Sequence, residues 1–181
     1  MEPVHRPAVR VICFDAEGRI LLLQWQDPLD PANRIWEPPG GGIDPGETPL
    51  QAARRELTEE TGLDPSEIRD TPVDVERDSR WKRQRYVGRE QFFPAFYRTS
   101  RPVVVREGLL EYEQSELITS AWTLPADFPD LPGRLEPPSL ADICRTFAAG
   151  LQRPDHRGHV LGAVAGGERL GVQVPADGDQ R

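Results

Sequence analysis

Three glutamates in this chain are spaced so that a helix would bring their carboxylates together. Glu56, Glu59 and Glu60 stand at positions i, i+3 and i+4, and residues at these spacings lie side by side on a helix surface. Like charges this close repel each other unless a cation offsets them. Mg²⁺ takes oxygen ligands and suits clustered carboxylates together with phosphate. The spacing therefore indicates a metal site, and a solvated acidic helix face is the alternative interpretation.

A helix from Pro49 to Thr61 is expected to carry these glutamates. Thr48 suits the N-cap, proline suits the first helical position, and Gln51 completes a capping box with Thr48. Gly62 is a suitable residue for the C-terminal end. Apolar residues at helical spacing predict the face that packs on the core: Leu50, Ala53 and Leu57.

A run of three glycines, from Gly40 to Gly42, precedes this helix. Because glycine has no side chain, such a run lets the backbone approach a ligand closely, although by itself it would also fit a flexible loop. From Gly41 to Leu63 the chain resembles the Nudix box, G-x5-E-x7-R-E-U-x-E-E-x-G-U with U apolar, and it matches every specified position. The upstream Trp36-Glu37-Pro38-Pro39 resembles the lead-in of that family, with Pro38 where an apolar residue is common.

The resemblance implies an α/β fold, the Nudix α/β/α sandwich, in which helices flank a mixed β-sheet. We expect residues 1–151 to form this Nudix hydrolase domain. We expect residues 152–181 to form a C-terminal extension that is either mobile or folded as a short added hairpin. His156 and His159 in that extension have no partner at metal-ligand spacing.

The hydrophobic pattern predicts where the strands of the sheet lie. Expected strands cover residues 8–14, 20–25, 73–76, 91–97, 103–106 and 118–123. A proline-interrupted loop is expected at 27–35, and Ser139 is expected to cap a final helix.

For the chemistry, the resemblance implies Mg²⁺-dependent hydrolysis, with Mn²⁺ as an alternative metal, of a pyrophosphate bond. The substrate would be a nucleoside diphosphate linked to another moiety. Glu56, Glu59 and Glu60 would hold the metal together with the backbone carbonyl of Gly41, and Glu59 and Glu60 are the catalytic candidates inside the box. Arg55 would orient a glutamate rather than touch the substrate.

The attacking water needs a general base, which in this family is either a glutamate of the box or one from a loop outside it. Glu111, Glu113 and Glu116 precede the expected strand at 118–123. Glu116 is the preferred candidate because it is nearest to that strand, which would hold it in a fixed place.

A basic segment follows the box, from Arg77 to Tyr86. Arginines can clamp phosphates and aromatic rings can stack on a base, so this segment is the expected substrate-binding loop. The substrate-binding candidates are Arg80, Trp81, Arg83 and Arg85. A solvated basic loop is the alternative. Motifs that would select an ADP-ribose, dinucleoside polyphosphate or coenzyme A substrate are absent, so the pattern leaves the substrate open.

The composition narrows the classes of partner. A net charge of −8 and a pI near 5.0 argue against a stable nucleic-acid complex and against binding to an anionic membrane. Cys13 and Cys144 lie in apolar segments, as reduced core thiols do. We therefore expect a cytoplasmic protein with a small-molecule nucleotide or related diphosphate as its partner, and a homodimer is left open.

Two other functions of the same fold compete with hydrolysis. A module that senses a nucleotide without cleaving it usually lacks box carboxylates, whereas this chain keeps all of them. An isomerase of prenyl diphosphates needs an active-site cysteine, and Cys13 and Cys144 lie in the wrong segments for that role.

Overall fold

The computed structural model describes residues 2–151, so the expected C-terminal extension and its histidines lie outside the described residues. Helix α1 (Pro49–Thr61) has the predicted bounds and the predicted caps. The Thr48 hydroxyl accepts a hydrogen bond from the Gln51 N–H, and the Gln51 side chain accepts one from the Thr48 N–H. Gly62, in the left-handed conformation at φ +66°, donates its N–H to the carbonyl of Thr58. These contacts fix both ends of the helix that carries the three glutamates.

Eight strands of the described chain form one mixed sheet. The strands are β1 (Val4–His5), β2 (Ala8–Phe14), β3 (Ile20–Asp27), β4 (Asp30–Glu37), β5 (Val73–Trp81), β6 (Gln84–Phe96), β7 (Leu117–Thr123) and β8 (Arg134–Leu135). Besides α1, the helices are α2 (Glu111–Glu116) and α3 (Leu140–Leu151), with short 3-10 helices η1 (Pro65–Glu67) and η2 (Pro125–Asp130).

The sheet consists of two groups of strands that share a narrow junction. In one group β6 runs parallel to β2 and antiparallel to β5. In the other, β3 runs antiparallel to both β4 and β7. The two groups meet at a single register pair between β2 and β3, Phe14 with Ile20. The rest of the β2 edge that faces β3 is therefore free to bond the glycine loop, where Val9 donates to the carbonyl of Gly41 at 2.9 Å.

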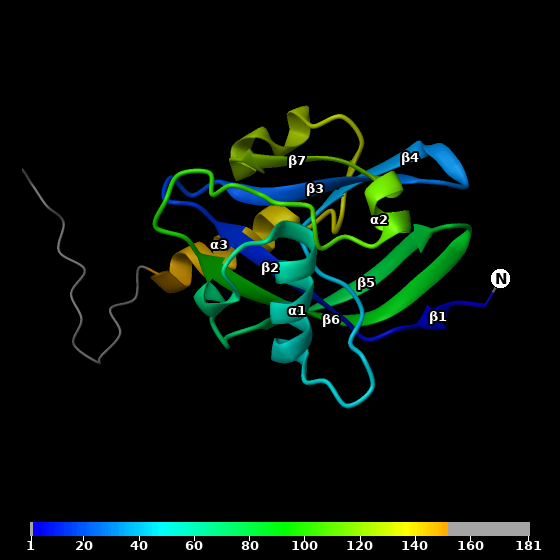
Figure 1. Cartoon of the computed structure of the whole chain (residues 1–181), viewed down its shortest axis with the longest axis horizontal. Helices are drawn as coiled ribbons and strands as arrows, with labels where there is room; N and C mark the ends of the chain where they lie inside the picture. The colour runs from blue at the N-terminus through cyan, green and yellow to red at the C-terminus, as the bar shows by residue number, and fades with distance from the viewer. Residues whose placement is uncertain (1, 152–181) are drawn as a thin grey trace, which may run out of the picture.

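Alternating side chains of β2 explain why both faces of the sheet are covered. Val9, Val11 and Cys13 pack toward α1, against Ala53 and Leu57. Ile12 and Phe14 point the other way, into a second core that α3 covers with Leu140, Ile143, Cys144 and Phe147. Figure 1 shows α1 and α3 on opposite sides of the sheet, the expected α/β/α arrangement.

Both cysteines are free and buried, one in each core, and burial raises the pKa of both thiols. They are the core thiols that the sequence predicts.

Four local expectations from the sequence are wrong. The expected loop at 27–35 is largely strand β4, which pairs with β3. The expected basic loop at 77–86 is the tip of the β5–β6 hairpin. Residues 103–106 form no strand, and the glutamates at 111–116 lie on the short helix α2. In the first two cases, cross-strand pairing overrides the local proline and charge content.

Gly40 provides a test of how tightly the glycine loop packs on β2. At φ +143° a side chain is strained, and a Cβ there would overlap the carbonyl oxygen of Val9. Gly40→Ala should therefore lower the free energy of unfolding by roughly 2–4 kcal/mol, measured by urea denaturation. Gly18→Ala is the matched control, because Gly18 also has a positive φ but no neighbouring atom within 4 Å of the added carbon. A smaller loss for Gly40→Ala than for Gly18→Ala would contradict this packing.

Candidate active site

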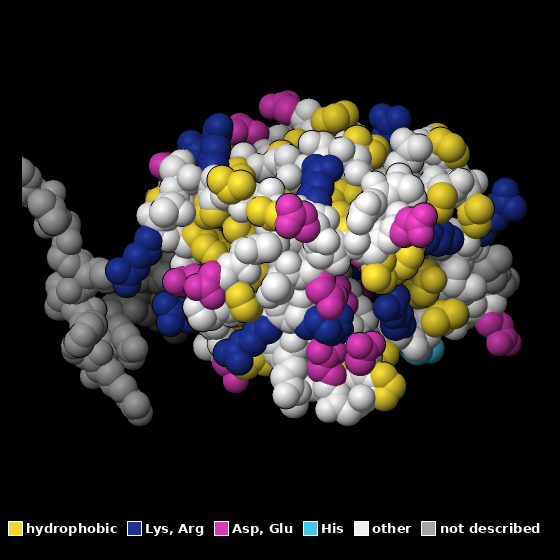
Figure 2. Space-filling model, in the orientation of Figure 1, with side chains coloured by type: hydrophobic (Ala, Val, Ile, Leu, Met, Phe, Trp, Pro, Cys, Tyr) yellow, Lys and Arg dark blue, Asp and Glu magenta, His cyan; other side chains and the backbone are white. Residues whose placement is uncertain are grey.

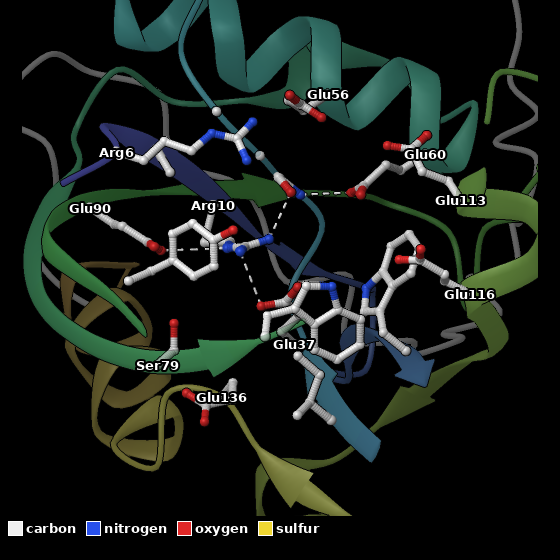
Figure 3. Close-up of a pocket in the computed structure, with 18 of the residues that line it drawn as sticks. Arg6, Arg10, Glu37, Glu56, Glu60, Ser79, Glu90, Glu113, Glu116 and Glu136 are labelled. Carbon is white, nitrogen blue, oxygen red and sulfur yellow. Dashed lines mark hydrogen bonds and ion pairs between the residues drawn. The ribbon is translucent and has the colours of Figure 1, made fainter. Parts of the chain in front are cut away.

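A cavity of about 680 Å³ opens between α1, the glycine loop, the β5–β6 hairpin and α2. Ligand pockets commonly have this size. Figure 3 shows Glu56 and Glu60 on α1 at one end of the cavity and Ser79 and Glu136 at the other. The candidate metal ligands and the candidate base Glu116 line the same space. The fold thus brings together residues that are far apart in the chain.

Arg55 is the centre of the polar contacts on this face of α1. Its guanidinium donates to both carboxylate oxygens of Glu47 at 3.0 and 2.9 Å, to the carbonyl of Gly42 at 3.0 Å, to Glu56 at 2.8 Å and to Glu59 at 3.3 Å. The hydrogen bond from Arg55 lowers the pKa of Glu47. Figure 2 shows basic and acidic side chains clustered on the face where α1 lies. Arg55 therefore bonds the carboxylates of Glu47, Glu56 and Glu59 at once.

Glu60 is the most deeply buried of the three glutamates, with the residue 5% exposed. Its Oε2 accepts the N–H of Gly40 at 2.7 Å, and Arg10 Nη1 donates to the carbonyl of the same glycine at 2.7 Å. Gly40 is thus held from both sides. Burial raises the pKa of Glu60 well above its usual value, while the charge of Arg10 and the Gly40 N–H act in the opposite direction. A cation beside this carboxylate would favour its ionised form.

Gly41 lies against the partly buried carboxylate of Glu56. A Cβ on Gly41 would stand 2.5 Å from Oε1 of Glu56, so a side chain would separate the loop from the helix. Burial raises the pKa of Glu56, and the hydrogen bond from Arg55 opposes that shift. Carboxylate and carbonyl oxygens packed this closely are the donors that Mg²⁺ or Mn²⁺ prefers.

The three glutamates are held by protein partners rather than arranged as a ready-made ligand set. Among residues 2–151, no group of three His, Cys, Asp or Glu side chains has a geometry that would hold a metal ion. Glu56 and Glu59 turn toward Arg55, and Glu60 turns toward Gly40. The donor chemistry fits a hard divalent cation, but Glu56 and Glu59 would have to rotate away from Arg55 to bind it.

The substrate-binding candidates divide into two pairs. Arg80 and Trp81 line the cavity, whereas Arg83 and Arg85 do not. Arg83 occupies the turn of the hairpin at φ +60°, and Arg85 forms an ion pair with Asp78 at 2.6 Å on the outer side. The alternation of strand β5 turns Arg77, Ser79 and Trp81 inward and Asp78 outward, so it accounts for Trp81. Arg80 is exposed and has the parity of Asp78, and it lines both the cavity and the outer surface beside Asp78 and Arg85.

Glu116 is anchored by the tip of the hairpin. Its Oε1 lies 2.6 Å from Nζ of Lys82, which also stands 5.1 Å from the ring centroid of Tyr112. The backbone N–H of Lys82 donates to the buried carboxylate of Asp27 at 2.8 Å. Burial would raise the pKa of Asp27, but hydrogen bonds from this N–H, from that of Leu29 and from Asn33 hold it below its usual value. Lys82 therefore links the hairpin tip to Glu116 of α2 at the wall of the cavity.

Several cavity residues have no counterpart in the sequence-based candidates. Arg6 lies over Gly42, close enough to exclude a side chain at that glycine. The far end of the cavity holds a cluster of buried charges, which we call the floor cluster: Arg10, Arg77, Glu37, Glu90 and Glu136. Arg10 could have been found from the sequence, because it is a charged residue inside the apolar run of β2. Glu90 and Glu136 stand in segments whose local pattern carries no such signal.

The protein is an α/β/α sandwich with a mixed sheet. Its helix α1 carries the three glutamates and lies beside a glycine loop that bonds the edge of β2. The model of the NUDIX domain matches residues 4–141, and the chain belongs to the NUDIX family. The predicted family and fold class are thereby confirmed.

Relatives and solved structures agree with this assignment. An RNA pyrophosphohydrolase of Caulobacter vibrioides is 46% identical over 66 residues, which are 36% of this chain and 37% of that protein. The chain thus matches little more than a third of the length of this curated relative. A MutT protein from Methanosarcina mazei Go1 superposes with a TM-score of 0.55 at 18% identity, over 84% of this chain and 99% of that one. The NUDIX domain of NrtR from Shewanella oneidensis, solved with ADP ribose, has a TM-score of 0.56 at 21% identity, over 81% and 90%.

Proposed function

We propose that this protein hydrolyses a pyrophosphate bond in a nucleoside diphosphate linked to another moiety. The observation that carries the proposal is the placement of the box carboxylates, of which Glu60 is buried, against a glycine loop in one cavity with arginines and a lysine. The NUDIX family assignment and relatives named RNA pyrophosphohydrolases support it. Incubation with a panel of nucleotides and Mg²⁺, followed by assay of the phosphate products, tests it directly.

Glu56, Glu59, Glu60 and the carbonyl of Gly41 would hold Mg²⁺, or Mn²⁺ in its place. A bound divalent ion supplies neutralisation of phosphate charge and acidification of water. The chain's own contribution is to keep the would-be ligands close, because Arg55 holds Glu56 and Glu59 and the Gly40 N–H holds Glu60. Arg80 and Trp81 would contact the substrate at the cavity wall.

Glu116 would accept the proton of the attacking water. It lines the cavity and is only 8% exposed, and its ion pair with Lys82 keeps its charge compensated in the absence of substrate. Substrate phosphates would compete for the same ammonium, because Lys82 also lines the cavity. The carboxylate would then be free to act as a base.

A nucleotide-sensing module that does not hydrolyse its ligand is the second candidate. It is favoured by one observation, the occupation of Glu56 and Glu59 by Arg55. Binding of a nucleotide without release of phosphate products, at any Mg²⁺ or Mn²⁺ concentration, would establish this alternative.

The cellular setting is also a proposal. Two free buried cysteines support a reducing, cytoplasmic location, and none of the helices in the described part is long and apolar enough to cross a bilayer. A homodimer stays a prediction, which sedimentation would test.

Replacing a box glutamate tests the metal assignment. Glu59→Gln and Glu60→Gln keep the shape of the side chain but remove its charge, so turnover should fall by at least about a hundredfold. Folding should survive, and relief of repulsion should leave the melting temperature in EDTA unchanged or higher. Glu76→Gln, a change at an exposed residue of β5, is the control. Full activity in both box variants would exclude the metal site.

Replacing the candidate base Glu116 should change kcat and its dependence on pH. Glu116→Gln should lower kcat with little change in KM, and the loss should shrink as pH rises, since hydroxide replaces the missing base. Glu111→Gln, outside the cavity lining, serves as the control. If the pH profile of Glu116→Gln coincides with that of the unmodified protein, Glu116 is not the base. If Glu111→Gln and Glu113→Gln also keep full kcat, the base lies within the box.

The division of the arginines predicts a contrast in substrate affinity. Arg80→Ala should raise KM severalfold with a smaller effect on kcat, because phosphate clamping contributes to ground-state and transition-state binding alike. Arg83→Ala and Arg85→Ala should leave both constants within about twofold of their original values, because these side chains lie outside the cavity lining. Steady-state kinetics on one substrate decides, and equal effects of all three changes would refute the division.

A further inference from the structure

The basic residues that line the cavity differ in whether a carboxylate already engages them. Five of them form ion pairs with glutamates: Arg10, Arg55, Arg77, Lys82 and Arg134. The other two, Arg6 and Arg80, form no ion pair with any residue from 2 to 151. Arg80 is already a candidate for substrate binding, whereas Arg6 has no assigned role. Arg6 is therefore a cation of the cavity wall that the described part of the chain does not neutralise.

Backbone pairing on two sides fixes where Arg6 lies. Before it, β1 pairs with β6. After it, the chain pairs with the glycine loop, because Ile43 donates its N–H to the carbonyl of Pro7 at 3.1 Å and Ala8 forms a bridge with Gly42. Side chains alternate along an extended chain, so Arg6 and Ala8 face the same way, and both line the cavity. The exposed side chain of Arg6 thus starts from an anchored backbone.

Gly42 leaves room for the Arg6 side chain. A Cβ on Gly42 would overlap the guanidinium, at 2.5 Å from Nε and 2.7 Å from Cζ. The backbone of Gly42 lies outside the positive-φ region that favours glycine, and the box pattern accepts any residue at this position. The contact with Arg6, rather than the backbone conformation, therefore explains why position 42 has no side chain.

Arg6 lies at the end of the cavity where the box carboxylates are. Figure 3 shows its guanidinium beside the glycine loop, on the side where α1 carries Glu56. The carboxylates gathered there would repel the phosphates of a substrate. Arg55 offers little compensation, because its guanidinium already bonds carboxylates and a carbonyl. Arg6 makes no side-chain hydrogen bond within residues 2–151, so its N–H groups are available to an anion.

We propose that Arg6 binds the phosphate chain of the substrate next to the box carboxylates, and that Gly42 keeps its guanidinium in that position. A guanidinium can donate two parallel hydrogen bonds to one phosphate. Arg80 would bind the same chain from the β5–β6 hairpin, so the pyrophosphate would lie between cations from two walls. This inference rests on the proposed function, because it takes the substrate to be a diphosphate.

Binding of methylenediphosphonate tests the proposal. This compound has a CH₂ group in place of the bridging oxygen of pyrophosphate, so it is not hydrolysed, and it has no nucleobase. Calorimetry with Mg²⁺ compares the unmodified protein with Arg6→Ala. Since a hydrogen bond to a charged group contributes strongly, Arg6→Ala should raise the Kd at least about tenfold. A Kd within about twofold of the original value, or no binding to the unmodified protein, would overturn the proposal.

Arg54→Ala is the matched control. Arg54 is also exposed and forms no ion pair within the described residues, but it lies on α1 outside the cavity lining. Both substitutions remove one exposed positive charge, so a general effect of net charge would be the same in both. Arg54→Ala should leave the Kd within about twofold of the original value. Equal losses of affinity in the two variants would count against a specific role of Arg6.

Gly42→Ala tests whether the glycine acts through Arg6. The three atoms nearest to the added carbon all belong to the end of the Arg6 side chain, so this side chain can move away and the melting temperature should stay close to the original. Gly42→Ala should weaken binding in the same direction as Arg6→Ala. The double variant should bind no more weakly than Arg6→Ala alone, because both changes act on one guanidinium. Additive losses would refute the role given to Gly42.

The outcomes separate this inference from the proposed function, because methylenediphosphonate binds without turnover. Arg6-dependent binding by a protein that releases no phosphate products from any nucleotide would support the inference and overturn the hydrolase proposal. Hydrolysis whose KM does not change in Arg6→Ala would leave the function standing and overturn the inference.

Discussion

One buried guanidinium, that of Arg10, joins the two ends of the cavity. It bonds the carbonyl of Gly40, whose N–H is taken by Glu60, and it pairs with Glu37 and Glu90 of the floor. Removing a charge from such a buried group leaves its partners uncompensated, which costs more than the contact itself contributes. The glycine loop, helix α1 and the floor therefore depend on a single side chain that enters from β2.

The parts of the fold that the sequence predicts are those governed by local rules. Helix α1, its capping box and its glycine stop follow from side chains a few residues apart, and β2 follows from an uninterrupted apolar run. Strand β4 and the hairpin tip are different, because their residues become strand only through pairing with β3 and β6. No local sequence pattern predicts which strand such a segment will pair with.

The same distinction holds for the candidate site. The box glutamates and Arg55 share one helix, so spacing alone places them together. Glu116 is brought to the cavity by α2 and held by Lys82 of the hairpin. The floor cluster draws its members from β2, β4, β5, β6 and the residue after β8, which the chain separates by more than a hundred positions. Buried opposite charges from five segments cannot be paired by inspection of one sequence.

The turn at the tip of the hairpin has a consequence for the balance between stability and activity. Lys82 and Arg83 adopt φ values of +51° and +60°, a conformation that costs a residue with a side chain roughly 1 kcal/mol or more and that Asn-Gly would adopt readily. The chain instead keeps a lysine there, whose N–H is bonded by Asp27 and whose ammonium reaches Glu116. A sequence selected only for a rigid fold would replace this pair. The strained turn therefore marks a place where stability is lower than the fold allows and where a cation lies in the cavity wall.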